Sequence, residues 1–241
     1  MVEPLPRAFF ARPSLEVAPD LLGRLLVRPL PEGVLAGRIV ECEAYEEGDP
    51  ASHSFRGPTD RTAVMFGPPG HLYVYFTYGM HFCMNVVTGD DGEGSAVLLR
   101  AVEPTDGLDR MRERRGISDA RILCAGPGRL AQAFGITRAE NGMDLVSGRD
   151  MFIGEGEPIS EESLGVGGRI GISVAMDRPW RFYVTGNAFV SRAPLGRSRR
   201  AVGSAATPTA KETVKARATG RAKAKGSAAA GEEESRSRPS A

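Results

Sequence analysis

The hydrophobic positions of this chain fall into many short runs that proline and glycine separate. A few other stretches, such as DGLDRMRERRG and PGRLAQAFGI, have the spacing of helices. The short runs have the length and the β-branched and aromatic content of strands. They are LLVRPL, GRIVECEAY, HLYVYFTY, HFCMNVV, SAVLLRAV, RIGISVAM and WRFYVTG. The pattern predicts a single α+β domain over residues 1–193, with a curved, mainly antiparallel β-sheet and a few flanking helices.

The run GRIVECEAY alternates in a way that separates two kinds of side chain. Small apolar residues fall on one face of an extended chain, and the other face carries Ile39, Glu41, Glu43 and Tyr45. The acidic face is either the solvated side of an edge strand or the floor of a site. Taken alone, the two glutamates favour the solvated edge. However, His53 follows in an acidic loop and an aromatic strand comes next, and both features favour a site.

The aromatic strand and the run after it predict a protruding β-hairpin. HLYVYF forms one strand, TYGM the turn and HFCMNVV the returning strand, with Gly79 providing a permissive backbone. Tyr75 lies on a strand face, and Tyr78 lies at the exposed tip, where it is either accidental or a wedge that enters a partner. Asn85 on the returning strand either points into a pocket or only satisfies backbone groups.

Several classes of protein are excluded by missing motifs. The sequence has no GxxxxGK[ST] phosphate loop and no GxSxG elbow, and GVGGRIG precedes a strand-like run instead of a helix. No apolar run is long enough for a signal peptide or a membrane span. Neither the histidines nor the cysteines have metal-ligand spacing. We therefore expect no metal, no other cofactor and no disulfide, in a reducing cytoplasm. The residues concerned are His53, His71, His81, Cys42, Cys83 and Cys124.

Charge divides the chain into two parts. Residues 1–191 contain 19 arginines, no lysine and 26 acidic residues, for a formal charge of −7, whereas residues 192–241 carry +8. Without a lysine, the body has no side-chain amine for imine chemistry. Acid–base catalysis with water remains, with Glu41 and Glu43 as the candidates.

The segment 194–241 consists of alanine, glycine, serine, threonine, lysine and arginine with almost no large apolar residue. Such a segment buries too little surface to offset its ordering entropy, so we predict that it is disordered. A basic tail of this kind either adds non-specific contact to DNA or only keeps the protein soluble, and its composition favours neither.

Three further features have a structural and a functional interpretation. Arg100 ends an apolar strand and either faces the carboxylates or forms a surface ion pair. The arginines of RMRERRG form either a solvated helix face or a phosphate-binding patch. The segment before LAQAF resembles a helix N-terminus whose amides either bind a phosphate or are simply capped. Trp180 is most simply a core residue.

Several long blocks in order resemble the alkyladenine (3-methyladenine) DNA glycosylase family, over roughly residues 8–191. They are GRIVECEAY, ASHSFRG, GPPGHLYVYFTYGMHFCMNVV, AVLLRAVEP, AGPGRLAQAFGI and GRIGISVAMDRPWRFYVTGNAFVS. The resemblance implies a monofunctional base-excision repair enzyme, monomeric and without a cofactor, in the cytoplasm at the bacterial nucleoid. It would remove alkylated or deaminated purines from double-stranded DNA by base flipping.

The resemblance also implies a role for individual residues. Glu43 would be the general base that activates water, with Arg100 and a main-chain carbonyl of residues 169–171 holding that water. Tyr45, His53 and Tyr75 would bind the flipped purine, and Asn85 would clash with the exocyclic amine of normal guanine. Tyr78 would fill the hole left in the duplex, and Glu41 would be structural.

The sequence departs from the family pattern in three places: Cys42 stands where threonine is common, His81 where tyrosine is common, and SVAMDRP diverges. The last two put the substrate range in doubt more than the reaction. Chemistry alone leaves two alternatives. One is a glycoside hydrolase with Glu41 and Glu43 as an acid–base pair, which their adjacency on one strand disfavours. The other is a lesion-binding DNA protein without catalysis.

Overall fold

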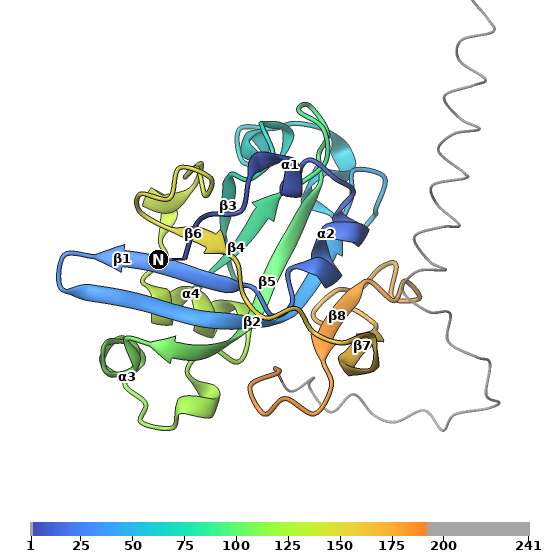
Figure 1. Cartoon of the computed structure of the whole chain (residues 1–241). Coiled ribbons are helices and arrows are strands. Elements are labelled where there is room, and N and C mark those ends of the chain that lie inside the picture. Colours follow the sequence, from blue (N-terminus) through green and yellow to red (C-terminus); the bar gives the residue numbers. More distant parts are fainter. Residues whose placement is uncertain (1, 192–241) are drawn as a thin grey trace, which may run out of the picture. The chain divides into compact units, whose positions relative to one another are not determined.

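The computed structural model describes residues 2–191, which form one mixed domain around an open antiparallel sheet (Figure 1). The sheet has eight strands, of which six follow the order β3-β4-β5-β2-β1-β6, while β8 pairs with both β2 and β7. The predicted α+β class with an antiparallel sheet is therefore confirmed. The tail 194–241, including its predicted disorder, lies outside the described residues.

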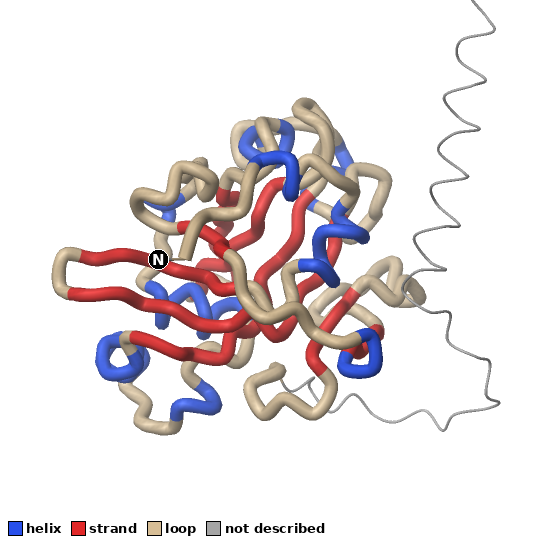
Figure 2. Tube along the Cα trace, viewed as in Figure 1, coloured by secondary structure: helices blue, strands red, loops and turns tan. Residues whose placement is uncertain are grey.

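The strands account for most of the regular structure, and the helices are short and lie around the sheet (Figure 2). The α-helices are α1 (Arg7–Phe10), α2 (Ser14–Asp20), α3 (Leu108–Arg115) and α4 (Pro127–Phe134). The strands are β1 (Leu25–Leu30), β2 (Gly33–Tyr45), β3 (Leu72–Thr77), β4 (His81–Val87), β5 (Ala96–Asp106), β6 (Phe152–Gly154), β7 (Leu164–Gly167) and β8 (Arg181–Val184). Short 3₁₀ helices include His53–Arg56 and Ala63–Phe66.

The long strand β2 lies inside the sheet over most of its length. Its first half pairs with β1, its second half pairs with β8, and β5 pairs along its other edge. The two glutamates occupy the second half and are fully buried. The acidic face is therefore not the solvated side of an edge strand. The geometry favours its interpretation as the floor of a site.

The predicted β-hairpin is confirmed. Strands β3 and β4 pair in register from Leu72 with Val86 to Thr77 with His81. Tyr78 and Gly79 both have positive φ, 51° and 66°, as the two central residues of a type I′ turn require. Tyr78 is 79% exposed, so the turn presents a large aromatic ring to solvent.

The two helices expected from the sequence are present as α3 and α4. Helix α4 begins with proline at its first position, buries Leu130 and Phe134, and packs against β4, β5 and α3. Both helices end at a left-handed glycine, Gly116 and Gly135, whose conformation satisfies carbonyls of the last turn.

The run RIGISVAM, predicted as a strand, is a loop instead. Strand β7 lies in the glycine-rich segment just before it, and the chain then turns through Gly171 and Ala175, whose φ angles are 83° and 49°. The apolar content was misleading because the backbone N–H and carbonyl of Ile170 bond to side chains of the site instead of to a neighbouring strand.

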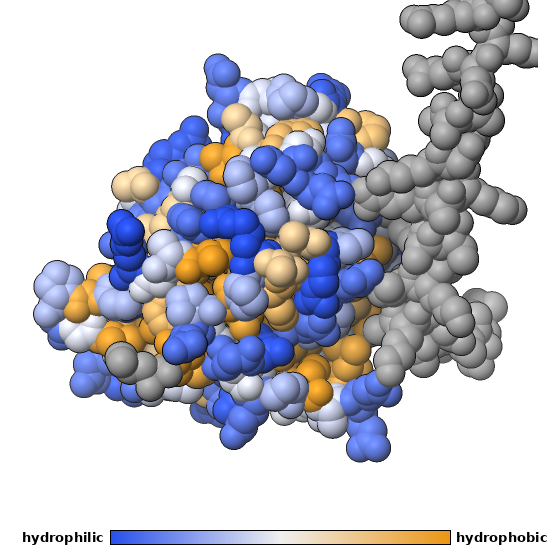
Figure 3. All heavy atoms as spheres, turned by 45° about the horizontal axis from the view of Figure 1, so that its top comes forward, coloured by the Kyte–Doolittle hydropathy of each residue, from blue (hydrophilic) through white to orange (hydrophobic). Residues whose placement is uncertain are grey.

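The core consists of the inward faces of the sheet and the helices packed on them, and Trp180, 4% exposed, belongs to it as predicted. On the face in Figure 3, hydrophobic residues lie in small patches among charged and polar ones. Within residues 2–191, no helix is long and apolar enough to cross a membrane.

Candidate active site

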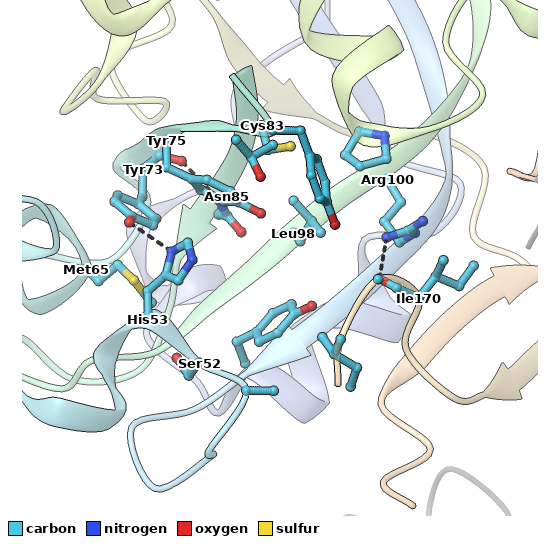
Figure 4. A pocket seen from close by; sticks show the side chains of 17 residues that line it. Ser52, His53, Met65, Tyr73, Tyr75, Cys83, Asn85, Leu98, Arg100 and Ile170 are labelled. Atoms are coloured by element: carbon cyan, nitrogen blue, oxygen red, sulfur yellow. Dashed lines mark hydrogen bonds between the residues drawn. The ribbon is translucent and has the colours of Figure 1, made fainter. Parts of the chain in front are cut away.

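A cavity of about 200 Å³ opens beside the β3–β4 hairpin. Its walls come from β3, β4, β5, the end of β2, the 3₁₀ helix at His53 and the loop after β7 (Figure 4). Of the residues predicted for a site, all but one line it directly. They are Tyr45, His53, Tyr75, Tyr78, Asn85 and Arg100; the other lining residues are Ala51, Ser52, Met65, Tyr73, Thr77, Cys83, Leu98, Pro127, Ile170, Gly171 and Ile172.

One lateral row of the sheet explains why these residues meet. Tyr73 pairs with Asn85, Asn85 pairs with Leu98, and Leu98 pairs with Glu43. Residues directly opposite each other in a pleated sheet point to the same face. Four neighbouring strands of the sheet therefore direct these side chains toward one side of it.

Glu43 is the predicted site residue that does not line the cavity itself. Its carboxylate is fully buried directly behind the wall. Oε2 accepts a hydrogen bond from the Tyr45 hydroxyl at 2.9 Å, and Oε1 accepts one from the Ile170 N–H at 2.7 Å. Arg100 Nη1 lies 3.3 Å from Oε2. A carboxylate offers about four acceptor sites, so these partners leave roughly one unused.

The environment of Glu43 favours a base that is stronger than a solvated carboxylate. Burial raises the pKa of Glu43 above its ordinary value, and Arg100, the Ile170 N–H and the Tyr45 hydroxyl oppose this rise only in part. A raised pKa brings a general base closer to the pH at which it works. The geometry and the pKa therefore both suit proton abstraction.

Arg100 reaches the carboxylates from a part of β5 whose register with β2 is irregular. The register between β2 and β5 shifts on both sides of Glu41, and Arg100 has no Cα partner in it. Alternation along β5 places Arg100 on the same face as Leu98, the partner of Glu43. Arg100 Nε donates to Glu41 Oε1 at 3.2 Å, and Nη1 donates to the Ile170 carbonyl at 3.4 Å. The surface ion pair considered for Arg100 is thus wrong.

The contacts of Glu41 indicate a structural role. Its Oε1 also accepts from Arg181 Nε at 2.6 Å, and its Oε2 accepts from the Ser191 N–H at 2.8 Å. Because these partners occupy both oxygens, Glu41 fixes Arg100 and joins β2 to β8 and to the end of the described chain. It is absent from the cavity wall.

Aromatic rings form the wall opposite Arg100 and Ile170 (Figure 4). The His53 ring lies edge-on to Tyr75, with centroids 4.5 Å apart, and its Nδ1 lies 3.1 Å from the Tyr73 hydroxyl. Burial, and secondly the nearby Arg61 guanidinium, lowers the pKa of His53 to about 4. His53 is therefore neutral at neutral pH, and burial raises the pKa values of the Tyr73 and Tyr75 phenols, so both stay protonated.

Arg61 also indicates the tautomer of His53. Its Nη2 lies 3.5 Å from His53 Nε2, and a guanidinium can only donate. This contact favours a lone pair on Nε2 and the proton on Nδ1, which then donates to the Tyr73 hydroxyl. Asn85 combines the two roles considered for it, because its Nδ2 donates to the Tyr73 carbonyl at 3.1 Å while the side chain lines the cavity.

A buried ion-pair cluster that the sequence did not indicate supports Tyr45 from behind. Arg169 and Asp49 form a salt bridge with both side chains fully buried, and Arg178 Nη1 lies 3.2 Å from Asp49 Oδ1. The Arg169 guanidinium lies between the rings of Tyr45 and Trp180, 4.6 and 5.0 Å from their centroids. These contacts fix the Tyr45 ring and the loop after β7.

Metal chemistry has no obvious ligand set here. Within residues 2–191, no three His, Cys, Asp or Glu side chains are grouped so that they could hold a metal ion, and all three cysteines are free and buried.

Comparison with known sequences identifies the family of this chain. The sequence profile of the methylpurine-DNA glycosylase family matches residues 8–188, so the chain belongs to that family.

Similar proteins come from distant organisms. A relative in Carboxydothermus hydrogenoformans is 52% identical over 188 residues, covering 78% of this chain and 98% of the relative. One in Rhodopseudomonas palustris (strain HaA2) is 54% identical, covering 78% and 90%, and one in Methanoculleus marisnigri is 52% identical, covering 78% and 98%. Each carries the name "Putative 3-methyladenine DNA glycosylase".

The Asp49 cluster yields a stability prediction. Asp49→Asn removes the charge that the buried Arg169 and the partly exposed Arg178 share, and we expect a loss of about 3–5 kcal/mol in the free energy of unfolding at neutral pH. Urea denaturation measures it. Asp20→Asn, which removes the exposed partner of Arg12, is the matched control and should cost less than about 1 kcal/mol. Equal losses in the two variants would contradict the role given to Asp49.

Proposed function

We propose that this member of the family hydrolyses the N-glycosidic bond of alkylated or deaminated purines in double-stranded DNA, and leaves an abasic site without cutting the strand. Candidate substrates are 3-methyladenine, 7-methylguanine, hypoxanthine and ethenoadenine. The observation that carries the proposal is a buried carboxylate of raised pKa, Glu43, which bonds to residues in the wall of a cavity lined by phenol and imidazole rings.

The proposed reaction needs a water molecule between the Glu43 carboxylate and the anomeric carbon of the sugar. Three groups lie close together for this purpose: the Glu43 carboxylate, Arg100 Nη1 and the Ile170 carbonyl. The carboxylate would accept one proton of the water, the guanidinium would donate to its oxygen, and the carbonyl would accept its second proton. Glu43 would take the proton as the water attacks the anomeric carbon, while the purine departs with the bonding electrons.

The aromatic pocket suits a purine that has left the helix. A base inside a duplex is out of reach, so it must be extruded at a cost of roughly a few kcal/mol. Tyr45, His53 and Tyr75 would stack on it or bond to it, and a cationic alkylated purine would gain from the electron-rich ring faces. A neutral His53 adds no positive charge to oppose such a base.

We further propose that the protein acts as a monomer in the cytoplasm. The body of the chain has a formal charge of −7, so its contact with DNA would depend on local arginines. The basic tail 194–241 would add non-specific contact.

Glu43→Gln should slow excision by at least about 100-fold, because the amide cannot take up a proton. The assay is a duplex oligonucleotide with one hypoxanthine or ethenoadenine, incubated under single-turnover conditions and then treated with alkali. Glu103→Gln, which changes a carboxylate bonded to Asn187 away from the cavity, is the control and should retain the rate. An active Glu43→Gln enzyme would exclude the general base.

The same assay tests the absence of strand cleavage. The body contains no lysine, so we expect a break only after alkali. A break before alkali, together with an enzyme–DNA adduct trapped by borohydride, would contradict hydrolysis by water.

The pH profile should show one acid limb. With 7-methylguanine as the substrate, the leaving group is already cationic and needs no general acid. The pH dependence of the single-turnover rate then reports the protonation of the general base alone. The rate should fall as the pH drops through the raised pKa of Glu43, above its ordinary 4.5. His53 titrates only near pH 4, so His53→Asn should lower the rate without moving the midpoint of this limb. A shifted midpoint would assign the limb to His53.

Tyr78→Ser should impair extrusion of the base more than the chemistry. We expect excision from a fully paired duplex to fall at least about tenfold, because an apolar wedge offsets lost stacking. The rate on the same lesion placed in an unpaired bubble should change little. Ile122→Ser, at another exposed apolar position, is the control. Equal losses on paired and unpaired DNA would remove the wedge role of Tyr78.

A further inference from the structure

The loop after β7 is rigid at its base. Arg169 and Arg178, which flank residues 170–177, both pair with Asp49, and both guanidiniums lie over the Trp180 ring. The loop also closes on itself, because a Cβ added at Gly168 would lie 3.7 Å from the Met176 carbonyl oxygen. We call residues 170–177 the apolar finger.

The tip of the apolar finger exposes hydrophobic side chains. Val174 is 47% exposed and Met176 is 67% exposed. Ala175 between them has φ 49°, a left-handed conformation that is strained for a residue with a Cβ. Strain that persists in a segment held so firmly indicates a conformation fixed by its surroundings.

The apolar finger lies at the mouth of the cavity, next to the hairpin tip. Gly171 and Ile172 line the cavity, and a Cβ added at Gly171 would lie 3.7 Å from the Tyr78 hydroxyl. Within residues 2–191, five of the nine exposed large hydrophobic residues belong to these two segments. They are Phe76, Tyr78, Met80, Val174 and Met176.

We propose that the apolar finger is a second contact to the DNA duplex, which packs its Val174 and Met176 side chains beside the extruded nucleotide while Tyr78 fills the vacated position. This inference rests on the proposed function. Extrusion exposes apolar faces of the neighbouring bases and the sugar, and apolar side chains offset that cost. The rigid base of the finger means that little ordering entropy is lost when it binds. Duplex DNA is the occupant because the finger continues the rim of the cavity that would receive the base.

The test uses the full-length protein and ethenoadenine, whose fluorescence changes when it unstacks. The double variant Val174→Ser/Met176→Ser should lower the ratio of extruded to stacked lesion in paired DNA by about tenfold. The rate at which this variant excises the lesion from an unpaired bubble should stay within about twofold of the wild-type rate. Val34→Ser, at a position also 47% exposed but at the start of β2, is the matched control. Met176→Leu should retain the wild-type equilibrium, because an apolar side chain of similar size remains.

Three results would overturn the proposal. One is a double variant that extrudes the lesion as well as Val34→Ser does. Another is an equal loss on paired and unpaired DNA, which would mean that the loop only supports the cavity. The third is a dimer in sedimentation that the double variant converts to monomer, since a second copy would then cover the finger. Failure of the proposed function is distinguishable, because the wild-type protein would then release no base from either substrate.

Discussion

The structure of the site depends on one guanidinium shared by two buried carboxylates. Arg100 contacts Glu41 with Nε and Glu43 with Nη1, and all three side chains are almost completely excluded from solvent. Two carboxylates on one strand would repel each other and pay a large desolvation penalty without a cation between them. Strand β5 supplies that cation, because Arg100 lies on the same face as Leu98, the partner of Glu43. Glu41 is then saturated by further donors, and this leaves Glu43 as the carboxylate with free capacity toward the cavity.

The same arrangement explains why a strand, and not a loop, carries the proposed base. Strand β2 is paired on both edges at Glu43, through Leu98 on β5 and Arg181 on β8. A side chain anchored in this way keeps its position relative to Tyr73 and Asn85, which lie in the same row of the sheet. A site built on regular elements holds its geometry better than one built on loops. The loop contributes the Ile170 backbone, and the Asp49 cluster restrains that loop.

Much of this arrangement could be predicted from the sequence because the strand period of two residues is a local signal. The alternation in GRIVECEAY placed Glu41, Glu43 and Tyr45 on one side, and the structure joins all three to one hydrogen-bonded network. The same alternation in the neighbouring strands predicts that Tyr73 shares a face with Tyr75, and Leu98 with Arg100.

Other features had no local signal in the sequence. The pairing of Asp49 with Arg169 joins residues 120 positions apart, and only the fold brings them together. The run RIGISVAM has the apolar content of a strand, yet the backbone of Ile170 bonds to Glu43 and Arg100. Tertiary contacts overrode propensity there, as they commonly do at functional sites.

The negative body of the chain is compatible with DNA because charge is distributed unevenly over it. Many arginines are taken up by acidic partners, as Arg7 is by Asp144. Among the described residues, Arg61 and Arg138 have no carboxylate within salt-bridge distance, and both act on the pKa of Tyr73 in the cavity wall. Positive charge without a carboxylate partner is thus present close to the cavity, and short-range contacts to phosphates depend on such local groups more than on the net charge.

Burial moves the two titratable groups of the site in opposite directions, and both shifts suit a cationic purine. It raises the pKa of the Glu43 carboxyl and lowers that of the His53 imidazole, because the charged form is disfavoured in each case. The wall therefore presents an imidazole that is neutral at neutral pH, and the Glu43 carboxyl behind it is paired with Arg100. In acid, protonation of Glu43 would remove the base and also leave Arg100 less compensated beside a cationic purine. Loss of the base and repulsion of the substrate would then act in the same direction, so one buried carboxylate would govern both binding and chemistry.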